Sequence, residues 1–182
     1  MSVRIGLLVG ALGLVGCAGT QSREARFTRA VLAQDVGDEA SAFAEYLRIV
    51  QAGEANSAVY NNLAVITARQ HKLAEARNWL EYAVATDADD VIARANLGVV
   101  QYHLGAPDKA AESLAEARMR RQEIIRRMPS MGRVNWYALR YAEFTEHADQ
   151  VARDYLDKIA HPSPAAAALP TGGTEIAWLI AE

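Results

Sequence analysis

Residues 60–68 read YNNLAVITA and residues 94–102 read RANLGVVQY, so an Asn-Leu-small-Val pattern recurs after 34 positions. The small residues of this pattern, Ala64 and Gly98, predict a close crossing of two helices. Apolar residues on both sides of them keep helical spacing, which predicts amphipathic helices. The recurrence continues downstream in three further pairs: Ala76 with Ala110, Leu80 with Leu114, and Ala83 with Ala117. A repeat of this length indicates stacked helical hairpins, in units spanning 23–56, 57–90 and 91–124.

The 34-residue period, with a small residue on the first helix and Ala, Leu and Ala on the second, resembles the tetratricopeptide repeat (TPR). The resemblance implies an all-α fold, a TPR-like α-solenoid of about three helix-turn-helix units. Turn positions fall at Gly37, His71 and Gly105. In the first unit Arg26 and Arg29 replace the bulky residue and the leucine that the family carries. The sequence therefore leaves open whether 23–56 is a full repeat.

The C-terminal third departs from the repeat. Helical spacing continues to about Arg127, and a Pro-Ser-Met-Gly turn follows at 129–132. Apolar residues then step by three and four from Tyr137 to Ile159, which predicts an amphipathic helix of about 25 residues. We expect 125–160 to cap the last repeat, and the alternative is a free partner-binding helix. Residues 161–182 are predicted to be a linker and an apolar tail, either docked on the array, disordered or used as a docking tag.

The N-terminus has the pattern of an export signal. Arg4 precedes an uncharged apolar run that is too short to span a bilayer as a helix. The run ends in Leu-Val-Gly before Cys17, which resembles the bacterial lipobox. The resemblance implies a signal peptide at 1–16, lipidation of Cys17 and a tether at 17–22. Ala18 is not the aspartate that marks inner-membrane retention, so the family rule places the protein at the outer membrane, facing the periplasm. The alternative is a plain secretory signal.

Composition limits the function. The chain has 182 residues, a net charge of −3 and one cysteine, which argues against nucleic acid as the main partner and excludes an internal disulfide. The histidines are scattered, and neither a nucleophile motif nor a nucleotide-binding loop is present. We therefore expect no enzyme activity, metal, cofactor or small-molecule substrate. The four histidines are His71, His103, His147 and His161.

In the TPR family the first helix of each unit lines a concave groove, and the resemblance places the partner site there. Asparagine amides there can bond a ligand backbone, and apolar and cationic side chains complete a peptide site. The alternative is that the two asparagines Asn62 and Asn96 only bond neighbouring backbone between units. The predicted groove residues are Asn61, Asn62, Val65, Arg69, Ile92, Asn96, Val99, Tyr102 and His103.

Seven arginines lie within 23 residues of the C-terminal third. They predict contact with an anionic lipid, glycan or protein face. The alternative is an ordinary solvated helix surface with cations near its C-terminus. The four that we single out for this contact are Arg118, Arg121, Arg126 and Arg127.

Small lipobox-bearing TPR proteins resemble the assembly lipoproteins of type IV and tight-adherence pili. The resemblance implies a lipid-anchored scaffold that binds a protein or peptide partner while a pilus or secretion complex assembles. The alternatives are a docking cofactor of peptidoglycan synthases or hydrolases, a purely structural tether, and a catalytic envelope protein.

Overall fold

The computed structural model describes residues 22–128 and 136–162; the predicted signal peptide, Cys17, most of the tether and the tail from 163 lie outside them. The described residues form helices and no strand, as the all-α prediction requires. The helices are α1 (Arg23–Asp35), α2 (Glu39–Gln51), α3 (Ser57–Arg69), α4 (Leu73–Thr86), α5 (Val91–His103), α6 (Pro107–Arg127) and α7 (Trp136–Ala160).

The helices begin in register with the repeat. The first helices of the hairpins start at Arg23, Ser57 and Val91, each 34 residues after the last. The residue before each start is a helix-capping type whose side chain accepts a backbone N–H bond, which satisfies a donor that the helix leaves unpaired. These caps are Ser22, Asn56 and Asp90. The second helices keep the same spacing and start at Glu39, Leu73 and Pro107.

The turns inside the hairpins also repeat. Gly37, His71 and Gly105 all have positive φ, at 80°, 61° and 76°. This left-handed conformation costs a residue with a Cβ about 1–2 kcal/mol, and glycine avoids that cost. His71 is therefore the strained member of the three turns.

We expect His71→Gly to stabilise the protein by about 0.5–1 kcal/mol, because removing the Cβ relieves the turn while the unfolded chain gains some freedom. Chemical denaturation of the purified variant measures this. The matched change Gly105→Ala should destabilise by a similar amount, and the account of the turns fails if both variants shift stability in the same direction.

Small buried residues hold each hairpin together. Ala30 and Ala64 on the first helices are fully buried, and Gly98 occupies the same register in α5. The facing residues Ala42, Ala76 and Ala110 are likewise fully buried. Small side chains let two helix axes approach closely, so the pattern that predicted a close crossing is confirmed.

The first hairpin is regular despite its two arginines. Arg29 Nη2 lies 3.2 Å from Glu45 Oε2 of α2, so the charge is paired within the hairpin. Tyr46 and Ile49 of α2 pack with Val59, Leu63 and Ile66 of α3 in one buried cluster. This cluster joins the first hairpin to the second.

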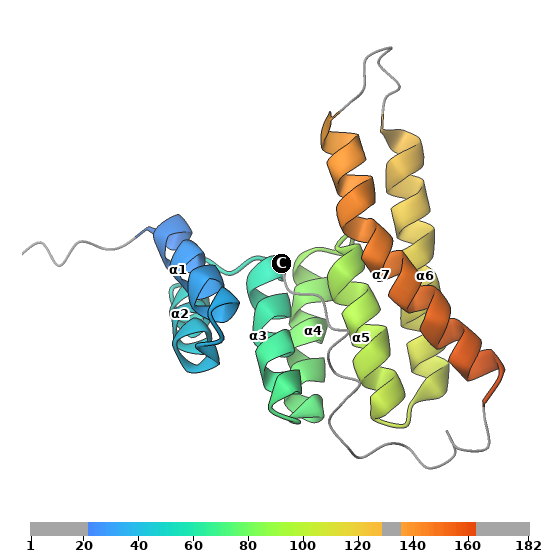
Figure 1. Ribbon diagram of the computed structural model, residues 1–182, viewed down its shortest axis with the longest axis horizontal. Helices are drawn as coiled ribbons and strands as arrows, with labels where there is room; N and C mark the ends of the chain where they lie inside the picture. Colours follow the sequence, from blue (N-terminus) through green and yellow to red (C-terminus); the bar gives the residue numbers. More distant parts are fainter. Residues whose placement is uncertain (1–21, 129–135, 163–182) are drawn as a thin grey trace, which may run out of the picture.

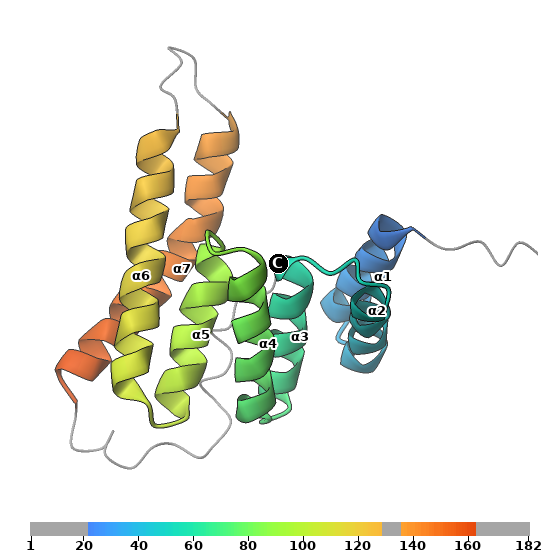
Figure 2. The same cartoon turned by 180° about the vertical axis from the view of Figure 1, so that it is seen from behind.

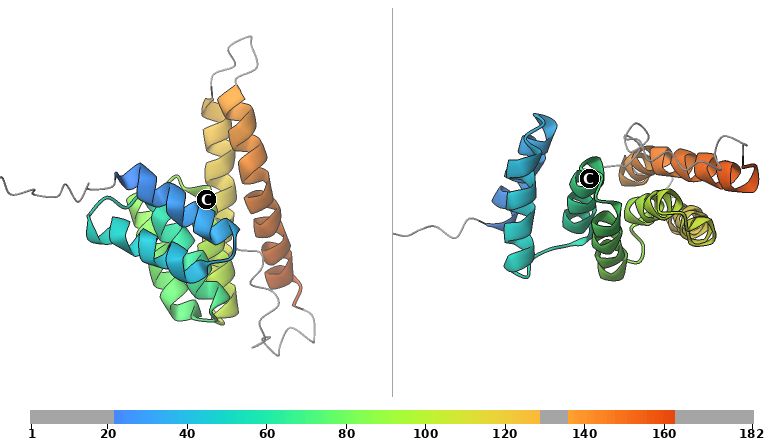
Figure 3. Two further views of the ribbon diagram at one scale, coloured as in Figure 1. Left: turned by 60° about the vertical axis from the view of Figure 1, so that its left-hand side comes forward. Right: turned by 90° about the horizontal axis from the view of Figure 1, so that it is seen from below.

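The last two helices form a long hairpin at one end of the array. α6 ends at Arg127, where the sequence pattern predicts its end, and α7 runs back along it. Figure 1 shows α1, α3 and α5 on the near face together with α7, and Figure 2 shows α2, α4 and α6 on the opposite face. In Figure 3 the α6–α7 hairpin projects beyond the other helices. α7 contacts both α5 and α6, so it caps the last repeat as predicted.

Candidate functional site

Most of the predicted groove residues are buried. Six of the nine have exposed fractions of 2% or less: Asn61, Asn62, Val65, Ile92, Asn96 and Val99. A partner-binding role for these six residues stays a prediction.

Two buried amide contacts explain the asparagines. Asn96 Nδ2 donates to Asn61 Oδ1 at 2.8 Å, which links α5 to α3. Asn62 Nδ2 donates to Tyr46 Oη at 2.9 Å, which links α3 to α2. Buried polar groups are stabilising only when paired, and here the pairs cross unit boundaries. These two contacts join side chains, so they differ from the alternative in which Asn62 and Asn96 only bond neighbouring backbone.

Helix α7 packs on α5 and α6 of the third unit. Val65 and Val99 share one buried core with Val151, Ala152 and Tyr155 of α7. Tyr102 meets Tyr155 edge to face, with ring centroids 5.2 Å apart. His103 Nε2 lies 2.8 Å from Tyr155 Oη. Of the nine predicted residues, Arg69 stays exposed, and its Nη1 lies 3.3 Å from Glu39 Oε1.

A cavity borders the N-terminal half of α7. It has a volume of about 340 Å³ and lies where the first turns of α3 and α5 and the 87–90 turn meet that half of α7. We call it the end cavity. Its wall combines carboxylates from the turn with aromatic rings from α7. The lining residues are Ser57, Ala58, Asp87, Asp89, Asp90, Val91, Ile92, Tyr141, Phe144 and Thr145.

Asp90 is the most buried carboxylate of the end cavity. Its Oδ1 caps α5 by accepting from the backbone N–H groups of Ile92 at 3.0 Å and Ala93 at 2.9 Å. Its side chain is 9% exposed, and Oδ2 has no hydrogen-bond partner of good geometry among the described residues. Burial raises the pKa of Asp90, although hydrogen bonds from Ala93 and Ser57 act to lower it.

The other two carboxylates differ in their pairing. Asp89 Oδ1 lies 2.6 Å from Arg120 Nη1, so its charge is balanced by α6. Asp87 Oδ1 accepts a backbone bond from Asp89, at 2.9 Å, and Asp87 has no ion pair within the described chain. Burial raises the pKa of Tyr141 to about 12, with Asp90 and Asp89 adding to the shift. The negative field of the turn therefore reaches the tyrosine ring across the cavity.

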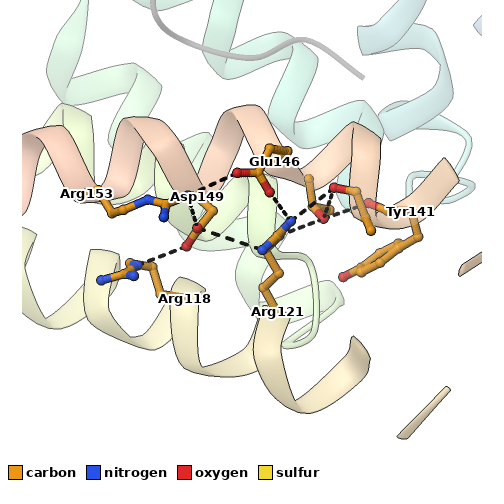
Figure 4. Close-up of polar contacts among 8 residues, drawn as sticks. Arg118, Arg121, Tyr141, Glu146, Asp149 and Arg153 are labelled. Carbon is orange, nitrogen blue, oxygen red and sulfur yellow. Dashed lines mark hydrogen bonds and ion pairs between the residues drawn. The ribbon is translucent and has the colours of Figure 1, made fainter. Parts of the chain in front are cut away.

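The arginine cluster is used inside the molecule. Arg118 Nε donates to Asp149 Oδ1 at 2.9 Å, and Arg153 Nη2 lies 2.6 Å from Asp149 Oδ2 (Figure 4). Arg121 joins the same network, with Nη2 at 2.5 Å from Glu146 Oε2. Asp149 is 7% exposed, so this network fixes α7 onto α6.

Arg118 and Arg121 are therefore poor candidates for an anionic surface, because their charges are answered by α7. Arg126 and Arg127 both pair with Glu123 but keep 77% and 73% of their side chains exposed. Surface contact with an anion stays a prediction for these two arginines.

The network gives a stability prediction. Arg121 also bonds Thr145 Oγ1 at 3.0 Å and the Ala142 carbonyl at 3.1 Å. We expect Arg121→Gln to lower the free energy of unfolding by about 1–3 kcal/mol, because charge-assisted bonds between two helices are lost. Urea denaturation measures this. The control Arg126→Gln should stay within about 0.5 kcal/mol, since exposed ion pairs contribute little; equal losses in both would contradict this role of Arg121.

The described residues contain neither a membrane-spanning helix nor a metal-binding cluster. None of the helices there has the length and apolar character needed to cross a bilayer. No group of three or more His, Cys, Asp or Glu residues within 22–128 and 136–162 is arranged to hold a metal ion.

Comparison with known proteins places the fold. No family model matches the chain, and no curated protein matches it. Among solved structures, the crystal structure of MamA, a TPR-containing protein, resembles this chain with a TM-score of 0.55 at 20% sequence identity. The match covers 79% of this chain and 79% of that chain. At this identity the likeness establishes the fold, a TPR-like helical solenoid, and nothing more specific.

Sequence reasoning missed the end cavity. Tyr141 and Phe144 belong to the apolar stripe from which the sequence predicts a capping helix, and that stripe gives no sign of a cavity. A signal was present in the sequence, since three aspartates within four residues exceed what one helix cap needs. The sequence did not show that α7 brings aromatic rings to the same place.

Proposed function

We propose that the chain is a lipid-anchored scaffold that faces the periplasm and binds a protein or peptide partner at the end cavity. TPR-like folds suggest protein partners, and the end cavity is the observation that carries the proposal. It is a recess lined by carboxylates of the 87–90 turn and by aromatic rings of α7. Phe144 is 51% exposed at its edge, so part of the aromatic wall is open to a partner.

The lipobox resemblance at Cys17 supports the anchor, and the resemblance to pilus-assembly lipoproteins supports a process. We propose that the partner belongs to a pilus or secretion complex assembled at the outer membrane. The anchored scaffold would hold this partner near the membrane and raise its local concentration there.

Site-specific photocrosslinking tests this function. We expect p-benzoylphenylalanine in place of Phe144 to crosslink to a partner in living cells, because that side chain borders the cavity. The same photoreactive residue in place of Tyr82, which is 58% exposed on α4, is the matched aromatic control and should give no such product. Mass spectrometry of the product names the partner. Crosslinking from Tyr82 with none from Phe144 would contradict the proposed site.

A further inference from the structure

The end cavity has an unbalanced negative charge. Asp87 and Asp90 form no ion pair within 4.0 Å in the described part of the chain, whereas Asp89 is paired with Arg120. Asp90 is nine-tenths buried and lines the cavity, where Ser57 is a nearby hydrogen-bond donor but Oδ2 has no partner of good geometry and no cation beside it among the described residues. A buried carboxylate without a cation is costly, so a cation that enters the cavity gains more there than at an exposed surface.

The helix N-termini at the cavity favour anions, but their effect is weaker than that of the carboxylates. The cavity includes the first residues of α3 and α5, and a helix N-terminus carries about half a positive charge. Both N-termini are already capped, by Asn56 Oδ1 on Val59 N–H and by Asp90 Oδ1 on Ile92 and Ala93 N–H. With these donors satisfied, the full charges of Asp87 and Asp90 outweigh the helix dipoles.

The aromatic rings that line the cavity also favour a cation. Tyr141 and Phe144 lie across the cavity from the carboxylates, and the face of an aromatic ring attracts an ammonium or guanidinium group. Carboxylates with aromatic rings thus match a side chain that has an apolar stem and a charged end, which describes lysine and arginine.

The C-terminal tail of this chain is a poor occupant. Residues 163–182 contain Glu175 and Glu182 but no lysine or arginine, so the tail cannot supply the cation. Charge complementarity therefore favours a separate basic partner.

We infer that the end cavity receives a lysine or arginine side chain of the partner protein, held between the carboxylates of Asp87 and Asp90 and the rings of Tyr141 and Phe144. This inference rests on the proposed function and specifies the partner's chemistry. Binding of a basic side chain would orient the partner segment at the end cavity, and α7 would stay packed on α5 and α6.

Amide chemical shifts of the full chain test the inference with defined probes. The probes are acetylated, amidated peptides Gly-Ala-X-Ala-Gly, in which X is lysine, arginine, norleucine or glutamate. We expect the lysine and arginine peptides to shift the amides of 87–92 and 141–145 in a saturable, salt-sensitive manner. The norleucine and glutamate peptides should bind about tenfold more weakly or not at all, because they lack the charge.

Two variants assign the contacts. Asp87→Asn combined with Asp90→Asn should weaken the lysine peptide about tenfold, and asparagine still caps α5. Asp108→Asn is the matched control and should change nothing. Asp108 is exposed in the first turn of α6, past the C-terminal end of α5, and the 13 residues of α5 separate it from the cavity by about 20 Å. Phe144→Ala removes an exposed ring wall without touching the cap and should also weaken binding.

Equal shifts from the norleucine peptide would show an apolar pocket and overturn the inference, as would an unchanged affinity in both the aspartate and the Phe144 variants. These results are independent of the crosslinking test. A partner crosslinked from Phe144 with no preference for basic peptides would leave the proposed function standing and reject its basic-side-chain chemistry.

Discussion

Cys17→Ser is expected to move the protein from the membrane fraction to the soluble fraction almost completely. Each buried methylene of an acyl chain contributes about 0.8 kcal/mol, so several chains on one cysteine hold a domain at a membrane essentially permanently. No helix among the described residues is long and apolar enough to cross a membrane. Fractionation of cells that express the full chain measures the change.

A neighbouring substitution serves as the control. By the family rule, Ala18→Asp preserves lipidation but directs the protein to the inner membrane, so it should stay membrane-bound and change its density in a sucrose gradient. Membrane association that persists in Cys17→Ser would reject the lipid anchor.

Gly98→Val is expected to lower the free energy of unfolding by more than about 3 kcal/mol. A Cβ at Gly98 would lie 2.5 Å from Leu114 Cγ and 3.2 Å from the Ala110 carbonyl oxygen, so the two helices of the hairpin would have to separate. Even Gly98→Ala should cost about 1–3 kcal/mol, because overpacking outweighs the gain in helix propensity. Urea denaturation followed by circular dichroism measures both variants.

A double variant identifies the cause. Leu114 is fully buried, so Leu114→Ala alone should cost about 2–5 kcal/mol by leaving a cavity. Combined with Gly98→Ala, it should cost clearly less than the sum of the single changes, because the new methyl group then has room. Strict additivity would mean that Gly98 is not required by contact with Leu114.

The fold was largely predictable because it depends on local patterns repeated at a fixed distance. Small residues such as Ala64 and Gly98 mark the helix crossings, and Gly37 and Gly105 mark left-handed turns. These features need no long-range information, since each hairpin buries its own stripe and then stacks on the next. His71, aligned with the glycines, adopts the same conformation because the register of the repeat overrides its preference.

The site was less predictable because it depends on where α7 lies. Periodicity shows that α7 is amphipathic, but it does not show that Val151 and Tyr155 share a buried core with Val65 and Val99. The density of arginines likewise gave no sign that Asp149 would bind Arg118 across two helices. The end cavity joins Asp87 to Phe144, which lie far apart in sequence, and only the packing of α7 brings them together.

Hydrogen exchange of the full chain, with and without the partner recovered by crosslinking, tests most directly that the partner binds at the end cavity while α7 stays packed on α5 and α6. The account predicts added protection in 87–92 and 141–145, with exchange of 148–156 unchanged. Faster exchange in 148–156, together with new protection in 61–69 and 95–103, would mean that the partner displaces α7 and would contradict it.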